Sequence, residues 1–352
     1  MTTDTSAPVQ PARGDDVPLR DRVTAPVHLE LPETDGVEWR PATLDDLDAL
    51  VSLHAALGRA DHPNYLISRE ELEDELSHSW VDRAADTLVG FRRDGAAVAF
   101  GLVALSPGKE TLVRSILWGG VHPELRGQGL GRQLLAWQEA RALQQLATVD
   151  LALPGWIMLY ADDRSQRTHR LAASAGFAPA RYFTGLSRVL ADPVPQLQLP
   201  DGVRIEPYRA ERGAATLEAK NAAFRDHWGS QPMTAEQWES MLGLSVFRPD
   251  LSFLALAGDE VIGFLTSEVN EDDWAGQGFS SAYIPLVGVV REWRRKGIAP
   301  ALLARAFSAF RDEGLERAVL DVDSDNPTGA LGLYTGMGFV PETRETAFSK
   351  VF

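Results

Sequence analysis

Two short segments combine glycine with positive charge in a way that suits the binding of a phosphate group. The first reads Arg126-Gly127-Gln128-Gly129-Leu130-Gly131, and the second reads Arg294-Arg295-Lys296-Gly297-Ile298-Ala299. A pyrophosphate needs several backbone N–H groups at a helix N-terminus, where the helix dipole favours anions. Small residues leave room for that approach. The alternative is a glycine-containing turn with no chemical role.

Each of these segments lies between a predicted strand and a predicted helix. Apolar runs at 117–121 and 284–290 indicate strands, and helical spacing follows at 132–143 and 299–313. A strand that leads through a tight turn into a helix presents the N-terminus of that helix to a ligand. Because this unit occurs twice, we interpret both turns as anion sites rather than as turns without a chemical role.

The chain repeats itself well beyond the two turns. Gly176-Phe177 recurs as Gly338-Phe339, and Ser187-Arg188-Val189-Leu190 recurs as Ser349-Lys350-Val351-Phe352, in the same order and at similar spacing. A period this long indicates duplicated domains rather than a solenoid. We expect a disordered leader at 1–27, an N-terminal domain at 28–190, a proline-containing linker at 191–200 and a C-terminal domain at 201–352.

Each half is predicted to fold in the order β-α-α-β-β-β-α-β-α-β, and the second half is the better defined. A threonine at 234 followed by glutamine at 237 predicts the start of a helix. We therefore expect two α+β domains, each a mixed, mostly antiparallel sheet flanked by helices. In the second half the strands are expected at 203–207, 251–257, 261–269, 281–290, 318–322 and 348–352, and the helices at 214–225, 233–244, 299–313 and 329–335.

Composition excludes several kinds of chemistry. The 352 residues include no cysteine, which removes disulfides, cysteine–zinc sites and a cysteine acyl-enzyme. A net charge of −16 repels nucleic acid and anionic membranes at long range. No apolar run reaches the roughly 20 residues of a membrane helix, and the N-terminus lacks the features of a secretory signal. We expect a cytoplasmic protein, monomeric or homodimeric, with no metal.

Both turns resemble the acyl-CoA-binding motif of the GNAT superfamily of N-acetyltransferases, an Arg/Gln-x-x-Gly-x-Gly/Ala sequence after a strand. The segment from Asp321 through Asn326 to Tyr334, followed by Gly338-Phe339, resembles the next motif of that family. The resemblance covers both halves. The tandem layout, with His227-Trp228 after a helix end, is similar to the actinobacterial mycothiol synthase group, although Tyr283 stands where those enzymes carry a glutamate.

The resemblance implies acetyl transfer from acetyl-CoA to an amine in the second half. In this family two neighbouring strands splay apart, which would place the main chain of Val287, Gly288 and Val289 against the pantetheine, with an N–H near Val289 stabilising the carbonyl oxygen. Tyr334 occupies the family position of the acid that protonates the leaving thiolate. The alternative is a tyrosine that only packs in a helix.

The acceptor amine must lose a proton before it attacks, because an alkyl ammonium is not nucleophilic. Glu268, near the end of its strand, is our first choice of base, although the acidic loop after it also suits a solvated surface. Asp226, His227 and Trp228 lie in the region that shapes the acceptor site in this fold, and Tyr283 begins the next strand. A loop with a packed tryptophan is the alternative.

The first half keeps the phosphate turn but differs at the catalytic position. Ala172 stands where the second half has Tyr334, and the asparagine that opens the helix is absent. We therefore expect a degenerate N-terminal copy that retains CoA binding or completes the acceptor site, while activity in both copies stays open. A non-catalytic acyl-CoA sensor is the rival to an enzyme, and a protein amine is the rival to a small-molecule acceptor.

Overall fold

The computed structural model describes residues 16–62, 65–195, 197–325 and 329–352. These residues fall into two compact units. The first unit contains the chain up to His62, then Leu66–Tyr182 and Glu345–Phe352. The second unit contains Tyr65 and Phe183–Arg344. Each unit is a mixed sheet with helices on both faces, which is the α+β class that the sequence predicts.

The sheet of the first unit has six strands in the order β1-β2-β3-β4-β5-β12. Neighbours are antiparallel except β4 and β5, which are parallel. The strands are β1 (Val37–Arg40), β2 (Thr87–Arg92), β3 (Ala97–Leu105), β4 (Val113–Val121), β5 (Gly155–Asp162) and the 345–351 part of β12 (Val340–Val351). The helices are α1 (Leu19–Arg22), α2 (Leu47–Asp61), α3 (Arg69–Ser77), α4 (Arg83–Asp86), α5 (Leu130–Leu146) and α6 (Gln166–Ser174).

Helices α2 and α5 pack on opposite faces of the first sheet. A Cβ placed on Gly101 would touch Leu134 of α5, whereas one placed on Gly120 would touch Leu57 of α2. The two faces carry separate apolar cores. The short helix α1 joins the α5 side through Leu19, which is fully buried. The disorder expected for residues 1–27 therefore does not extend to this segment, and residues 1–15 lie outside the described part of the chain.

The sheet of the second unit repeats this order as β7-β8-β9-β10-β11-β6, again with one parallel pair, β10 and β11. The strands are β7 (Val203–Pro207), β8 (Phe253–Ala257), β9 (Glu260–Glu268), β10 (Ser281–Val289), β11 (Arg317–Asp323) and the 183–189 part of β6 (Ala178–Val189). The helices are α7 (Gly213–Phe224), α8 (Ala235–Gly243), α9 (Trp274–Gln277), α10 (Ile298–Asp312) and α11 (Ala330–Gly336).

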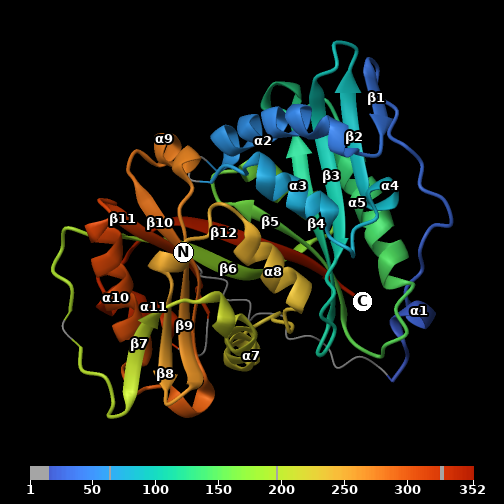
Figure 1. Cartoon of the computed structure of the whole chain (residues 1–352). Coiled ribbons are helices and arrows are strands. Elements are labelled where there is room, and N and C mark those ends of the chain that lie inside the picture. The colour runs from blue at the N-terminus through green and yellow to red at the C-terminus, as the bar shows by residue number, and fades with distance from the viewer. Residues whose placement is uncertain (1–15, 63–64, 196, 326–328) are drawn as a thin grey trace, which may run out of the picture. The chain divides into compact units, whose positions relative to one another are not determined.

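Helix α10 covers one face of the second sheet and α7 covers the other (Figure 1). A Cβ on Gly263 would meet Ile298 of α10, and one on Gly288 would meet Phe224 of α7. Helix α8 begins as the sequence predicts, because the Thr234 hydroxyl accepts from the N–H of Gln237 at 3.2 Å. The capping box thus sets the start of this helix.

The strand after the last helix of each half pairs in the sheet of the other unit. Residues 183–189 of β6 run antiparallel to β11, and residues 345–351 of β12 run antiparallel to β5. Figure 1 shows β12, in red, beside β5, in green. The repeat predicts that 348–352 belongs to the second domain, whereas in the structure this segment is part of the first unit. Two duplicated sheets offer equivalent free edges, so either strand suits either edge.

In each unit the parallel pair of strands separates partway along its length. β4 pairs with β5 only from Val113 to Ile116, although β4 continues to Val121. β10 pairs with β11 only from Ser281 to Tyr283, although β10 continues to Val289. Both units therefore contain the splayed strand pair that the sequence predicts, and each predicted phosphate turn follows the diverging end of one strand.

Candidate active site

The two predicted phosphate turns have the same backbone conformation. Gly127 and Gly129 have φ of +85° and +94°, and Arg295 and Gly297 have φ of +61° and +79°. Arg295 is the one non-glycine residue with positive φ in the part of the chain that the structure describes. A left-handed backbone costs such a residue about 1–2 kcal/mol. The second turn keeps this conformation despite that cost, so its geometry does not depend on glycine at both positions.

Neither helix that follows these turns has a side-chain cap at its N-terminus. Gly129 and Gly297 are the cap residues of α5 and α10, and neither helix has a side-chain cap hydrogen bond from this residue. A Cβ on Gly129 would have nothing within 4 Å, and one on Gly297 would meet only Gln198 O, at 3.8 Å. Uncapped N–H groups beside open space are what an anionic ligand requires.

The first arginine of each turn is used by the protein itself. Arg294 donates from Nε to the Val289 carbonyl at 3.3 Å and from a terminal nitrogen to the Ala223 carbonyl at 2.7 Å. Arg126 donates to the Val121 carbonyl at 3.0 Å and binds Asp61 through both terminal nitrogens. Both arginines are predicted cofactor ligands from the sequence, and in the structure each holds its turn to the preceding helix and strand.

The remaining charged and polar side chains of the turns are exposed, whereas the apolar ones are buried. Arg295, Lys296 and Gln128 lie at the surface, and the Lys296 ammonium lies 4.5 Å from the centre of the Trp293 ring. Leu130 and Ile298 point into the apolar cores. Side chains of Arg295 and Lys296 are thus available to an anion, while Leu130 and Ile298 offer only their backbone. Gly131 and Ala299 are the second residues of α5 and α10.

The main chain of β10 turns one N–H toward the gap between the splayed strands. Val290 donates its N–H to Ile262 on β9 at 3.0 Å. Successive N–H groups of an extended strand face opposite sides, so the N–H of Val289 faces the β11 side. In the first unit His122 donates to Val98 on β3, which turns the N–H of Val121 toward β5 in the same way.

Gly288 owes its lack of a side chain to packing. A Cβ at this position would lie 2.5 Å from the Phe264 ring and 3.1 Å from the Phe224 ring. Any larger residue would displace these aromatic side chains from the sheet surface. The family resemblance predicts that the main chain of Gly288 lies against the pantetheine, and the structure adds this packing reason for a glycine.

Tyr334 lies on α11 and is buried, with 7% of its surface exposed. Its ring stands edge-on to Phe339, with ring centres 5.8 Å apart. Burial raises the pKa of the phenol to about 12, so the hydroxyl keeps its proton at neutral pH. In the first unit the corresponding Ala172 is also buried. Asn326, a predicted cofactor ligand, lies outside the described residues.

Three polar side chains from neighbouring strands gather on the α7 face of the second sheet. The Tyr283 hydroxyl donates to Asp321 on β11 at 3.0 Å, and Tyr283 lies directly opposite Glu268 of β9 in the sheet register. Burial and the nearby carboxylates raise the pKa of Tyr283 well above 10. Glu268 and Tyr283 are predicted site residues from the sequence, whereas Asp321 is not. No sequence signal pointed to Asp321, because its contact with Tyr283 depends on the register of β10 and β11.

The residues after α7 lie beside the second turn. Asp226 binds Arg294 at 3.3 Å, so its carboxylate helps to hold the turn. The His227 ring lies 4.4 Å from the Phe224 ring, and burial, aided by Arg294, lowers the pKa of His227 against the opposing effect of Asp323. His227 is therefore neutral at pH 7, and Trp228 is half-buried.

The first unit repeats this arrangement and adds links to it. The His62 ring lies 3.8 Å from the Asp162 carboxylate at the end of β5. In the second unit the negative charge of Asp323, at the end of β11, acts on His227 in the same way. Asp61 accepts from both Arg126, after β4, and Ser165, before α6, the latter at 3.2 Å. The end of α2 therefore ties together the diverging ends of both splayed strands. Nothing in the sequence of either half predicted this link.

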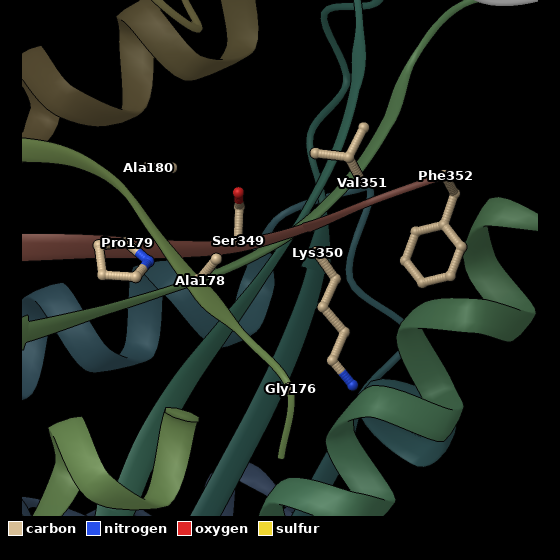
Figure 2. Close-up of a pocket in the computed structure, with 8 residues that line it drawn as sticks. All are labelled: Gly176, Ala178, Pro179, Ala180, Ser349, Lys350, Val351 and Phe352. Atoms are coloured by element: carbon tan, nitrogen blue, oxygen red, sulfur yellow. The ribbon is translucent and has the colours of Figure 1, made fainter. Parts of the chain in front are cut away.

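A pocket of about 370 Å³ in the first unit lies away from these residues (Figure 2). It is lined by β6 and β12 residues together with Gly176 and Phe352, and it contains none of the predicted site residues. Lys350, drawn in Figure 2, points to Glu139 and lies 4.8 Å from the centre of the Phe177 ring. The described residues contain no group of three or more histidine or acidic side chains placed to hold a metal ion. None of their helices has the length and apolarity to span a bilayer.

Comparison with known proteins gives consistent matches along the chain. The model of the acetyltransferase (GNAT) family matches residues 53–177 and again 214–339. A mycothiol acetyltransferase of a Nocardioides species is 30% identical over 236 residues, which is 64% of this chain and 77% of that protein. One from Frankia alni is 30% identical over 90% of this chain and 95% of its own length. A GCN5-related N-acetyltransferase structure from Sphaerobacter thermophilus has a TM-score of 0.67 at 27% identity, covering 92% of this chain and 97% of that one.

Proposed function

This chain belongs to the GNAT acetyltransferase family and carries two copies of its domain, and from that premise we propose that the second unit catalyses and the first does not. The reaction is direct transfer of an acetyl group from acetyl-CoA to the primary amine of a small molecule. The observation that carries this proposal is an asymmetry. Both units have the uncapped turn and the splayed strands, but only the second has a buried phenol, Tyr334, where the first has Ala172.

The turns fit the diphosphate of CoA by their conformation. Paired left-handed residues direct successive N–H groups to one side, and the helix dipole adds positive potential there. Arg295 and Lys296 would contribute charge to the second site, and Gln128 would contribute a donor to the first. Acetyl-CoA supplies an activated thioester. The remaining chemistry belongs to the side chains and main chain of the protein.

Each catalytic task has a candidate group in the second unit. The N–H of Val289 faces the gap between β10 and β11, where it would stabilise the negative charge that develops on the carbonyl oxygen. Tyr334 would donate its proton to the departing sulfur, since its raised pKa keeps the phenol protonated. Glu268 would remove a proton from the amine, and Tyr283, His227 and Trp228 would contact the acceptor.

The names of the relatives favour a particular acceptor as a second candidate. Both relatives described above are mycothiol acetyltransferases. By that similarity the acceptor would be the amine of a cysteinyl sugar. Tyr283 stands at the position where the resemblance predicts a glutamate in such enzymes. In this chain the Tyr283 hydroxyl donates to Asp321, so a tyrosine–carboxylate pair takes the place of that glutamate. A direct comparison of turnover with a cysteinyl-sugar amine and with simple primary amines distinguishes the two candidates.

Binding and turnover of acetyl-CoA test the proposal together. Acetyl-CoA should raise the melting temperature, and turnover with an amine panel should release free CoA thiol. Gly297→Glu should remove turnover, because its carboxylate would enter the anion site. Gly129→Glu is the matched control in the first unit and should leave turnover within about threefold. If Gly129→Glu abolishes turnover while Gly297→Glu preserves it, the catalytic assignment belongs to the first unit. Binding without turnover of any amine would favour an acyl-CoA sensor.

A further inference from the structure

Asp321 accepts a hydrogen bond from Tyr283 and has no role in the mechanism proposed above. Its Oδ2 accepts from the Tyr283 hydroxyl at 3.0 Å. Glu268, on the other side of Tyr283, lies directly opposite it on β9. Tyr283 pairs with Val319 on β11, and residues two apart on a strand share a face. Glu268, Tyr283 and Asp321 therefore form a row across three adjacent strands on the face that α7 covers.

The neighbouring strands leave room for the Asp321 carboxylate. Asp321 lies opposite Gly185 of β6, and its Oδ1 is 3.1 Å from the place where a Cβ on Gly185 would be. The Thr343 hydroxyl occupies the space above Gly185. A glycine at 185 thus leaves room for the side chains of Asp321 and Thr343 over β6. Neither Gly185 nor Thr343 carries a positive charge that would stabilise the ionised carboxylate.

The surroundings suit a group that accepts a proton. Water reaches Asp321, yet protein atoms crowd it, and this partial removal of water raises the pKa of Asp321 against the opposing hydrogen bond from Tyr283. Asp321 and Glu268 raise the pKa of Tyr283 by their charge, and Tyr65 of the same unit adds to this. No cation of the described residues is among these groups, so the two carboxylates favour an ammonium group over an anion.

We propose that Asp321 is the final acceptor of the proton that leaves the acceptor amine, and that Tyr283 passes it on. This inference rests on the proposed acetyl transfer. The ammonium gives one proton to the Tyr283 oxygen as the Tyr283 hydroxyl proton moves to Asp321. The free amine then forms the C–N bond, and the C–S bond breaks. The sulfur takes the proton of Tyr334, the second N–H proton restores that phenol, and Asp321 returns its proton to water.

In this relay Asp321 and Tyr283 take the role of base that is assigned to Glu268 in the proposed function, and Glu268 has a different task. Glu268 balances the charge of the ammonium while it binds, so its loss should raise KM for the amine more than it lowers kcat. Asp321 and Tyr283 act on the proton, so their loss should lower kcat. Because they act in series, removing both should cost little more than removing either one. This pattern separates the relay from a direct base at Glu268.

Steady-state kinetics of Asp321→Asn, Tyr283→Phe, the double variant and Glu268→Gln test this scheme in the full chain, with an amine that the wild-type protein acetylates. Asp321→Asn and Tyr283→Phe should each lower kcat by roughly 10²–10⁴-fold, the range for a positioned proton acceptor. The kcat of the double variant should lie within about threefold of the kcat of the less active single variant. The fall of kcat toward low pH, caused by protonation of Asp321, should disappear in Asp321→Asn.

Peptides of β10 and α10 should keep wild-type protection from hydrogen exchange in each variant, which shows that the second unit is folded. Asp312→Asn, an exposed change at the end of α10, is the matched control and should keep full kcat. If Asp321→Asn kept the wild-type kcat while Glu268→Gln lost most of it, the relay would be overturned and the proposed function would stand. The relay would also be overturned if the kcat loss of the double variant equalled the product of the two single losses. An inactive wild-type protein would refute both proposals.

Discussion

Replacing Phe348 with alanine tests whether the last strand of the chain belongs to the first unit. Phe348 lies on β12, is 3% exposed, and packs in the apolar core of the first unit with its ring 5.1 Å from His169. Its partner in the sheet is Leu159 of β5. The residue is near the C-terminus, so a chain divided only by its repeat would place its effect in the second domain.

The size of the effect follows from burial. Truncating a buried phenylalanine to alanine costs about 3–5 kcal/mol, because the cavity left behind closes only in part. Since 1.4 kcal/mol is about a factor of ten, local opening of the first unit should become at least ~100-fold more frequent. The matched variant is Leu186→Ala on β6, a fully buried residue of the second unit, with an expected cost of about 2–5 kcal/mol.

Hydrogen exchange read by mass spectrometry on peptides of each unit measures this. Phe348→Ala should speed exchange in β4 and β5 and leave β10 and β11 near their wild-type rates. Leu186→Ala should do the reverse. If Phe348→Ala instead loosened β10 and β11 while β5 stayed protected, the strand exchange described here would be wrong, and each half would keep its own final strand.

Four further outcomes are expected. Tyr334→Phe should lower kcat by roughly 10²–10⁴-fold with little change in acetyl-CoA affinity. Adding Ala172→Tyr to that variant should not restore activity, because the first half also lacks the asparagine that opens the helix. Turnover assays and titration with acetyl-CoA measure both outcomes. Burial raises the pKa of Tyr334 to about 12, so the phenol keeps its proton at any pH below that value, and kcat should not fall between about pH 8 and 10. A fall of kcat in this range that Tyr334→Phe removes would contradict this. Initial rates should give intersecting lines for acetyl-CoA and amine, whereas parallel lines would indicate an acyl-enzyme. The free energy of unfolding of Arg295→Gly should exceed that of Arg295→Ala by up to about 1 kcal/mol, because only glycine adopts the left-handed backbone without steric cost, and both should bind acetyl-CoA more weakly; equal free energies of unfolding would count against strain at Arg295.

Much of the candidate site depends on local sequence. The spacing of glycines at 127, 129 and 297 predicts the turn, because φ near +80° to +95° is accessible to glycine without steric cost. Thr234 and Gln237 predict the start of α8 for a similar reason, since a capping box needs only residues three apart. The asymmetry between Tyr334 and Ala172 was also visible, because it lies at one position of a repeated motif.

Roles that depend on distant partners were not visible in the sequence. Arg294 looks like a phosphate ligand by its position, but its guanidinium is held by the carbonyls of Val289 and Ala223. Gly288 looks like a point of ligand approach, but the Phe264 ring fills the place of its side chain. In both cases the deciding atoms come from another strand or helix, and no spacing along one segment specifies them.

The amino-acid sequence by itself determined the duplication, the α+β class of each half, the two phosphate turns and the position of the buried phenol. Each of these follows from periodicity or from backbone conformations that particular residues prefer. Only the tertiary structure decided that Asp321 meets Tyr283, and that β6 and β12 pair with β11 and β5 as they do. Alternating apolar residues make a strand, but duplicated sheets present equivalent edges, so the choice of edge lies in the packing of the whole chain.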